Sequence, residues 1–228
     1  MKSDLIGKKI ATLKKEIQGA KLVAVSKLSS IEEIDLAIKA KQYDFGENRV
    51  NDLLEKAVHF SNLNISKIKW HFIGNLQTKK IKELFSVPDL YAIHSVDSIR
   101  LLEEMLKKEN ELKSKEVKVF FQINTSHESE KNGFESIEEL KLAIGLLLKR
   151  AKPKLVFYGL MTMGTIRTDN FEAEAKRCFS DLARIGNEIK THFNLKEKVK
   201  LSMGMSSDYK LAITEGSDYV RIGSAIFK

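Results

Sequence analysis

Short apolar runs alternate with amphipathic stretches along the whole chain. The first run, Leu22–Val25, is rich in β-branched residues and stops at Ser26 and Lys27, which is typical of a strand buried on both faces. Before it, apolar residues recur at helical spacing over about residues 3–18 and predict an opening amphipathic helix. Further strands are predicted at about 43–45, 69–74, 90–94, 117–124, 155–161, 199–203 and 219–222, each separated from the next by a helical pattern.

Eight predicted strands that alternate with helices restrict the fold. Alternation alone would also fit a doubly wound open sheet, but the count of eight favours a single (β/α)8 TIM barrel with an additional N-terminal helix. No linker or low-complexity stretch interrupts the pattern in the 228 residues. We therefore expect one domain over residues 1–228.

Composition narrows the class of protein. No apolar run approaches the roughly 18 residues of a membrane span, and Met1–Leu5 does not begin a signal-peptide core. We therefore expect a cytoplasmic protein without membrane contact. The net charge of +8 could attract nucleic acid. However, the lysines are interleaved with glutamates and no aromatic-and-basic cluster is present, which favours a solvated surface over a nucleic-acid-binding protein.

Neither the cysteine nor the histidines indicate a reactive or metal centre. Cys178 shares helical spacing with apolar neighbours and is predicted to be a packed core thiol. Metal-ligand spacing is absent from the histidines, so we predict no metal. They are His59, His71, His94, His127 and His192.

Polar residues gather where the predicted strands end, which is where such barrels place their active sites. Lys27 follows the first strand, although it could simply mark where that strand meets water. The other strand ends carry Gly46-Glu47-Asn48, Gly74-Asn75, His94-Ser95, Asn124, Met161, Ser202 and Arg221. Together these residues would line one mouth.

The last two loops have the pattern of a phosphate site. Residues 202–208 read Ser-Met-Gly-Met-Ser-Ser-Asp, and Gly223-Ser224-Ala225 follows the eighth strand. Barrels commonly bind phosphate with the loops after strands seven and eight, through backbone N–H groups and hydroxyls. The alternative is that Ser206 or Ser207 is only a helix cap and Gly223 only a turn.

A lysine and a phosphate cradle at one mouth suggest pyridoxal phosphate, whose aldehyde reacts with an amine. Arg221 would lie near the pyridine ring, where it can only donate a hydrogen bond. It would leave the ring nitrogen unprotonated and weaken the cofactor as an electron sink. Alternatively, Arg221 pairs with a carboxylate such as Asp218 or Glu47.

The motifs resemble those of a known family over nearly the whole chain. They are Ala24–Lys27, Phe45–Asn48, Trp70–Gln77, Gln122–Asn124, Glu128 with Lys131–Gly133, Gly159–Met161, Leu201–Ser206 and Val220–Phe227. The chain closely resembles the YggS/PROSC pyridoxal phosphate homeostasis proteins, which look like the barrel domain of alanine racemase. One departure is Arg49, where the family usually has a tyrosine.

The resemblance implies a set of cofactor contacts. It implies pyridoxal 5′-phosphate held on Lys27 as an internal aldimine, and a ring-nitrogen contact from Arg221. The further residues implied are Ser206, Gly223 and Ser224 at the phosphate, and Asn48, Ser202 and Met203 elsewhere in the site. It also implies a non-enzymatic role in vitamin B6 homeostasis and in the balance of amino and keto acids.

Two functions remain open from the sequence. Racemisation needs two acid–base groups, and alanine racemase takes its second, a tyrosine, from an additional domain of a partner subunit. This sequence ends with the barrel, so we expect no such domain. The first hypothesis is a monomeric carrier of pyridoxal phosphate whose partners include apo forms of cofactor-dependent enzymes. The alternative is an amino-acid racemase of low activity.

Overall fold

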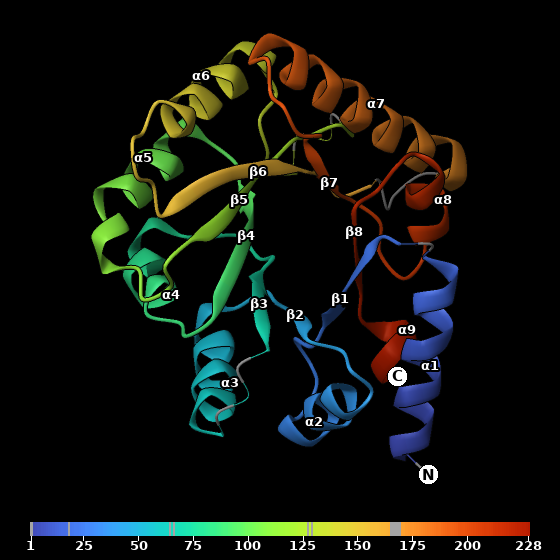
Figure 1. Ribbon diagram of the computed structural model, residues 1–228. Helices are drawn as coiled ribbons and strands as arrows, with labels where there is room; N and C mark the ends of the chain where they lie inside the picture. Colours follow the sequence, from blue (N-terminus) through green and yellow to red (C-terminus); the bar gives the residue numbers. More distant parts are fainter. Residues whose placement is uncertain are drawn as a thin grey trace.

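The computed structural model describes residues 2–17, 19–63, 65, 67–126, 128, 130–164 and 170–228. Its parallel strands pair in chain order, and β1 pairs with β8 to close a barrel (Figure 1). The strands are β1 (Lys21–Val25), β2 (Asp44–Glu47), β3 (Lys69–Phe72), β4 (Leu90–Val96), β5 (Val117–Gln122), β6 (Leu155–Met161), β7 (Lys200–Ser202) and β8 (Tyr219–Ile222). This closure confirms the predicted barrel and excludes the open sheet.

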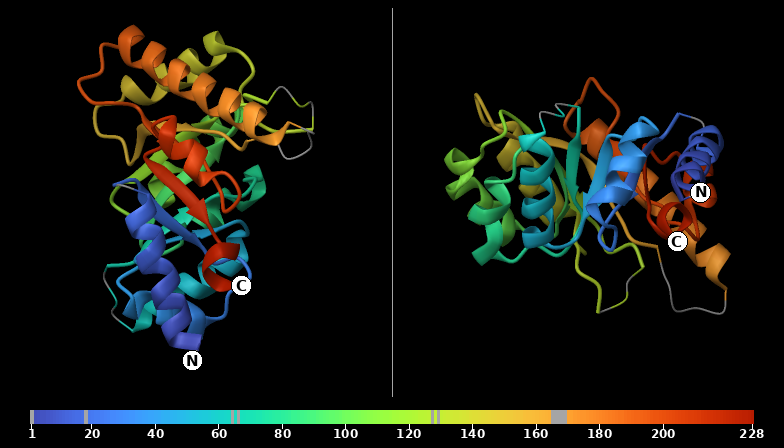
Figure 2. Two further views of the ribbon diagram at one scale, coloured as in Figure 1. Left: turned by 90° about the vertical axis from the view of Figure 1, so that its right-hand side faces the viewer. Right: turned by 90° about the horizontal axis from the view of Figure 1, so that it is seen from below.

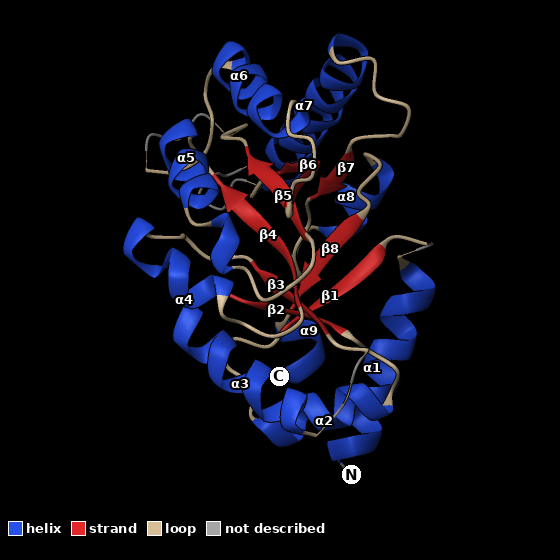
Figure 3. Ribbon diagram, turned by 60° about the vertical axis from the view of Figure 1, so that its left-hand side comes forward, coloured by secondary structure: helices blue, strands red, loops and turns tan. Residues whose placement is uncertain are grey.

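Helices surround the strands, as Figure 3 shows in blue around red. They are α1 (Lys2–Glu16), α2 (Ile31–Lys39), α3 (Val50–Asn62), α4 (Ile81–Phe85), α5 (Ile99–Lys107), α6 (Ile137–Leu148), α7 (Phe171–His192), α8 (Tyr209–Thr214) and α9 (Ser224–Phe227), with 3₁₀ turns η1 (Thr78–Lys80) and η2 (Glu109–Glu111). The sequence pattern did not predict α9, because four residues are too short to show a helical period. In the described part of the chain, none of the helices is long and apolar enough to cross a membrane.

Side chains of each strand alternate between two separate cores. Outward residues pack under the helices; Phe45 and Trp70, for example, have ring centroids 5.7 Å apart. Inward residues, among them Val23, Phe120 and Tyr219, form a smaller cluster inside the barrel. This alternation determines which polar side chains enter the interior.

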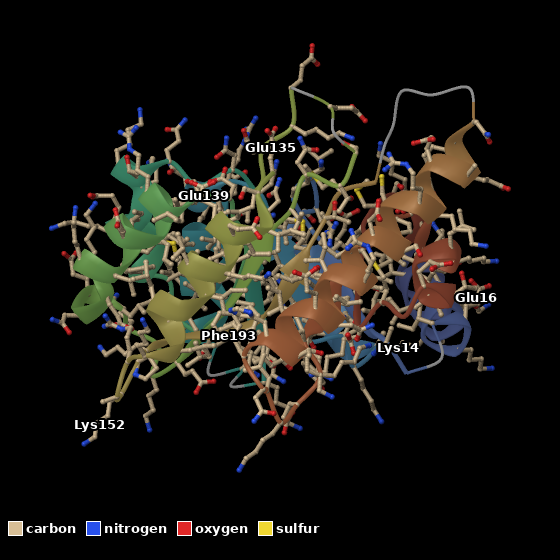
Figure 4. The ribbon with its side chains drawn as sticks, turned by 90° about the horizontal axis from the view of Figure 1, so that it is seen from above. Lys14, Glu16, Glu135, Glu139, Lys152 and Phe193 are labelled. Carbon is tan, nitrogen blue, oxygen red and sulfur yellow. The ribbon has the colours of Figure 1, made fainter. Side chains whose placement is uncertain are left out.

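The outer helices are joined by polar contacts. Figure 4 shows Glu16 on α1, where its carboxylate accepts a hydrogen bond from the Tyr209 hydroxyl at the start of α8. Lys141 of α6 and Glu188 of α7 form an ion pair with an N–O distance of 2.7 Å. The N-terminal α1 packs against α9, so the two termini lie on the same side of the barrel (Figure 2). Cys178 is buried in α7, as its spacing predicted.

Candidate functional site

Lys27 lies in the turn that follows β1, with its side chain exposed. Val25, the last residue of β1, has the same parity along the strand as Val23, which faces the barrel interior. The neighbouring β8 ends beside it: a Cβ atom at Gly223 would lie only 3.0 Å from the Val25 carbonyl oxygen. The structure therefore places Gly223 beside Val25, two residues before Lys27, at the carboxyl ends of β1 and β8.

A buried ion pair ties the end of β1 to the end of β2. The Glu47 Oε1 atom accepts hydrogen bonds from Ser26 Oγ at 2.6 Å and Lys56 Nζ at 2.8 Å, and Lys56 also donates to the Ser26 carbonyl at 2.7 Å. Burial raises the pKa of Glu47, and the bonds from Lys56 and Ser26 oppose that rise. This cluster fixes the positions of Ser26 and Glu47, the residues that directly precede Lys27 and Asn48.

Arg221 lies inside the barrel and is only 5% exposed. Its guanidinium donates to Ser202 Oγ at 2.6 Å and to the Thr162 carbonyl oxygen at 2.9 Å. Burial lowers the pKa of Arg221 to about 10, with the charge of Asp208 opposing the change, so the group is protonated at neutral pH. The two hydrogen bonds to Ser202 and Thr162 thus hold one side of the Arg221 guanidinium in place.

The predicted alternative of a carboxylate partner for Arg221 is wrong for both residues named. Asp218 accepts a bond from the Leu201 amide at 2.9 Å and pairs with Lys198 at 3.1 Å. Glu47 is held by Ser26 and Lys56, as described above. Because strand alternation places Glu47 outside the barrel and Arg221 inside, the two cannot meet.

The loop after β7 is a tight turn built on Gly204, which has a φ of +94°. A Cβ atom there would lie 2.6 Å from the Ala212 Cβ, so only glycine fits. Asp208, rather than Ser206 or Ser207, is the N-cap residue of α8, so the simple capping alternative is wrong. Within the described residues, the Ser206 and Ser224 hydroxyls have no protein partner. Both hydroxyls are therefore available to an anion.

The remaining predicted residues have different surroundings. Asn48 is exposed after β2, and its backbone lies so close to Gly74 that a Cβ at Gly74 would be 2.0 Å from the Asn48 carbonyl oxygen. Asn48 also borders a hollow of about 350 Å³ with Arg49 and Lys80. Met203 is fully buried in the outer core, so only its backbone can take part in a site.

Sequence reasoning missed the polar interior beneath Arg221. His94 Nδ1 lies 2.8 Å from Ser202 Oγ, and His71 Nδ1 lies 2.9 Å from His94 Nε2. The sequence placed His94 at the mouth as a strand-end residue, whereas the structure buries it inside the barrel; His71 was noticed only as part of a predicted strand. Among the described residues, no group of three or more potential ligands could hold a metal ion, and His127 lies outside them.

No family model matches the sequence. The chain is 39% identical over 210 residues to the pyridoxal phosphate homeostasis protein of Homo sapiens, and the match covers 91% of this chain and 75% of the human protein. Among solved structures, PipY of Synechococcus elongatus, with PLP bound, has a TM-score of 0.85 and 27% identity. That alignment covers 98% of this chain and all of PipY.

Alanine racemase from E. faecalis shares the fold alone, with a TM-score of 0.72 and 16% identity. The alignment covers 98% of this chain and 57% of the racemase. The resemblance indicated by the motifs is confirmed by the sequence match to the human protein, which extends over most of both chains. This chain belongs to the family of pyridoxal phosphate homeostasis proteins.

Proposed function

We propose that this protein binds pyridoxal 5′-phosphate at the carboxyl ends of its strands and acts in vitamin B6 homeostasis without robust catalysis. The observation that carries the proposal is the buried Arg221, held by Ser202 and Thr162 inside the barrel near the carboxyl end of β8. The PLP-bound structure of PipY and the name of the human relative support it.

The residues at this mouth match the separate parts of the cofactor. When bound, pyridoxal phosphate supplies an aldehyde that condenses reversibly with primary amines. Lys27 provides an exposed amine, and Arg221 retains N–H groups that can donate to the ring nitrogen. The Ser206 and Ser224 hydroxyls can donate to the phosphate, and Gly223, which has no side chain, lets its loop approach the Val25 carbonyl oxygen closely.

The positions of the tyrosines favour a carrier over a racemase. Tyr219 begins β8, and its hydroxyl lies 3.2 Å from that of Tyr158, inside the barrel. Tyr91 lies near the start of β4, and its hydroxyl accepts a hydrogen bond from Lys118. The Tyr209 hydroxyl donates a hydrogen bond to Glu16 on the outside of the barrel. Tyr43 precedes β2, at the opposite end from Lys27. None of the five therefore supplies a second acid–base group at the proposed site.

The proposal extends to the setting in which the protein works. We propose a single-domain, monomeric, cytoplasmic carrier that supplies cofactor to apo forms of pyridoxal phosphate-dependent enzymes. The exposed position of Lys27 supports exchange of the cofactor with solvent and with other proteins. A weak racemase remains the second candidate, supported by the shared fold of alanine racemase.

Absorbance and turnover together test this function. We expect the protein to bind pyridoxal phosphate with a visible absorbance band and to racemise D- or L-alanine more slowly than about 1 per second, the low end of ordinary enzymes. Turnover is measured by chiral chromatography. Lack of binding would overturn the cofactor assignment, and faster turnover would establish the racemase.

Ser206→Ala is expected to weaken pyridoxal phosphate binding about 10- to 100-fold, since a hydrogen bond to a charged group contributes about 1.5–3 kcal/mol. The affinity of the Ser206→Ala variant for pyridoxal, which lacks the phosphate, should equal that of the wild type. Equilibrium dialysis with both ligands measures the difference. Ser207→Ala, at the exposed neighbouring position, is the matched control. Equal losses for both ligands would show that Ser206 does not contact the phosphate.

A further inference from the structure

A continuous chain of polar side chains runs through the barrel interior from its amino-terminal end to Arg221. At the amino-terminal end, Asp44 Oδ1 lies 3.1 Å from His71 Nε2. The chain continues through His71 Nδ1 to His94 Nε2 at 2.9 Å and through His94 Nδ1 to Ser202 Oγ at 2.8 Å. It ends at Arg221, whose guanidinium nitrogen lies 2.6 Å from Ser202 Oγ.

The two imidazole rings are enclosed by aromatic side chains. The His94 ring stacks on Phe120 with ring centroids 4.2 Å apart. The centroid of the Tyr219 ring lies 6.0 Å from that of His71 and 6.1 Å from that of His94. Burial lowers the pKa of His71, and burial with the neighbouring His71 and Arg221 lowers the pKa of His94 still further. Both rings are therefore neutral at neutral pH.

The series of hydrogen bonds ends, away from Arg221, at the carboxylate of Asp44, which lies near Lys69 and Lys21. Asp44 begins β2, and its side chain is 22% exposed. Burial alone would raise the pKa of Asp44, but the bond from His71 and the charges of Lys69 and Lys21 outweigh it and lower the pKa. Asp44 is thus ionised at neutral pH and can only accept hydrogen bonds.

These end points allow one direction for every hydrogen bond in the chain. An arginine can only donate and an ionised carboxylate can only accept, while a neutral imidazole has one donor and one acceptor. Each member must therefore donate toward Asp44, in the order Arg221, Ser202, His94, His71, Asp44. Both histidines then carry their proton on Nε2.

We propose that Asp44, His71, His94 and Ser202 form a hydrogen-bonded relay that positions Arg221 and links it to the opposite end of the barrel. The relay holds the Ser202 hydrogen toward His94, which leaves an oxygen lone pair facing Arg221. The four residues are positioning residues, because they act through Arg221. Only the consequence for the cofactor rests on the proposed function; the relay itself does not.

The first test uses the wild-type protein without cofactor. Nitrogen NMR of isotope-labelled histidine distinguishes protonated from unprotonated ring nitrogens. We expect His71 and His94 each to show a protonated Nε2 and an unprotonated Nδ1 at neutral pH. A proton on Nδ1 of either ring would overturn the relay, and no variant has to fold for this result.

The second test breaks the relay at its distant end. Asp44→Leu removes the terminal acceptor, so we expect the His94 Nδ1 resonance to move toward the protonated position, although His94 does not contact Asp44. Asp44→Asn keeps an acceptor oxygen and should retain the wild-type spectrum. Asp89→Asn, which changes an exposed aspartate just before β4, is the matched control. An unchanged His94 spectrum in folded Asp44→Leu protein would overturn the proposed coupling.

A third measurement, on protein loaded with pyridoxal phosphate, separates this inference from the proposed function. In protein loaded with pyridoxal phosphate, we expect Asp44→Leu to shift the visible absorbance maximum, and Asp89→Asn to leave it unchanged. An unshifted maximum together with changed histidine tautomers would overturn the link from the relay to the cofactor. If no variant and no wild-type protein binds pyridoxal phosphate, the proposed function fails while the tautomer measurements still decide the relay.

Discussion

Lys27→Ala is expected to abolish the visible absorbance of the cofactor-loaded protein and all cofactor that borohydride fixes to the chain. The physical reason is that Lys27 is the one lysine in the described turn after β1, whereas the nearby Lys56 amine is held by Glu47 and the Ser26 carbonyl. The loss should be complete rather than partial, because a covalent attachment is removed. The absorbance spectrum measures the loss of the bound cofactor. Intact mass and peptide mapping after borohydride reduction measure the loss of the covalent attachment.

A second lysine at the same mouth provides the control. Lys80 borders the hollow near Asn48, and it pairs at the surface with Asn51 and Glu83. Lys80→Ala should retain the spectrum, and both variants should unfold within about 0.5 kcal/mol of the wild type, as surface substitutions usually do. A reduced adduct on another lysine of Lys27→Ala protein would show that Lys27 is not the attachment site.

Lys56→Met should destabilise the protein by about 3–5 kcal/mol at neutral pH, because it leaves a buried carboxylate without its cation. The side chain of Glu47 is completely buried and that of Lys56 is 12% exposed, so water does not replace the lost interaction. The double variant Lys56→Met/Glu47→Leu should recover most of the loss, because no buried charge remains. Urea-induced unfolding measures both free energies.

The loss in Lys56→Met should depend on pH. Burial already raises the pKa of Glu47 above its ordinary value of 4.5, and removal of Lys56 raises it further. A raised carboxyl pKa means that the folded state binds a proton more tightly than the unfolded chain, so stability is lost as pH rises through the folded pKa. The destabilisation should therefore be smaller at about pH 5 than at about pH 8.

Lys39→Met is the matched control for this pH dependence. Lys39 pairs with Asp35 at 2.6 Å on the surface, where its side chain is 70% exposed. Exposed pairs of this kind contribute less than about 1 kcal/mol. We expect a small loss that is equal at both pH values. An equally pH-independent loss in Lys56→Met would show that Glu47 is not the group responsible.

Local patterns along the chain predicted the elements and their order. The apolar run of β1 and the helical spacing of α7 each lie within one element, so neighbouring residues suffice to identify them. The count of eight strands then predicted the barrel and placed Lys27, Arg221 and Ser224 at one end of it. The short α9 escaped prediction because its four residues contain hardly more than one helical turn.

The contacts that set the chemistry of the site join residues far apart in the sequence. Ser202 lies 108 positions from His94 and 19 from Arg221, and Glu47 lies 21 from Ser26. No spacing rule relates such residues. Their meeting depends on the register between strands and on the closure of β1 against β8.

The sequence by itself determined the barrel, the mouth and the positions of Lys27 and Arg221 along the chain, because periodicity and strand order are encoded locally. Only the tertiary structure decided that Arg221 is held by Ser202 rather than by a carboxylate, and that His71, His94 and Asp44 continue inward from it. The reason is that barrel closure, which no local pattern encodes, chooses which inward side chains share the interior.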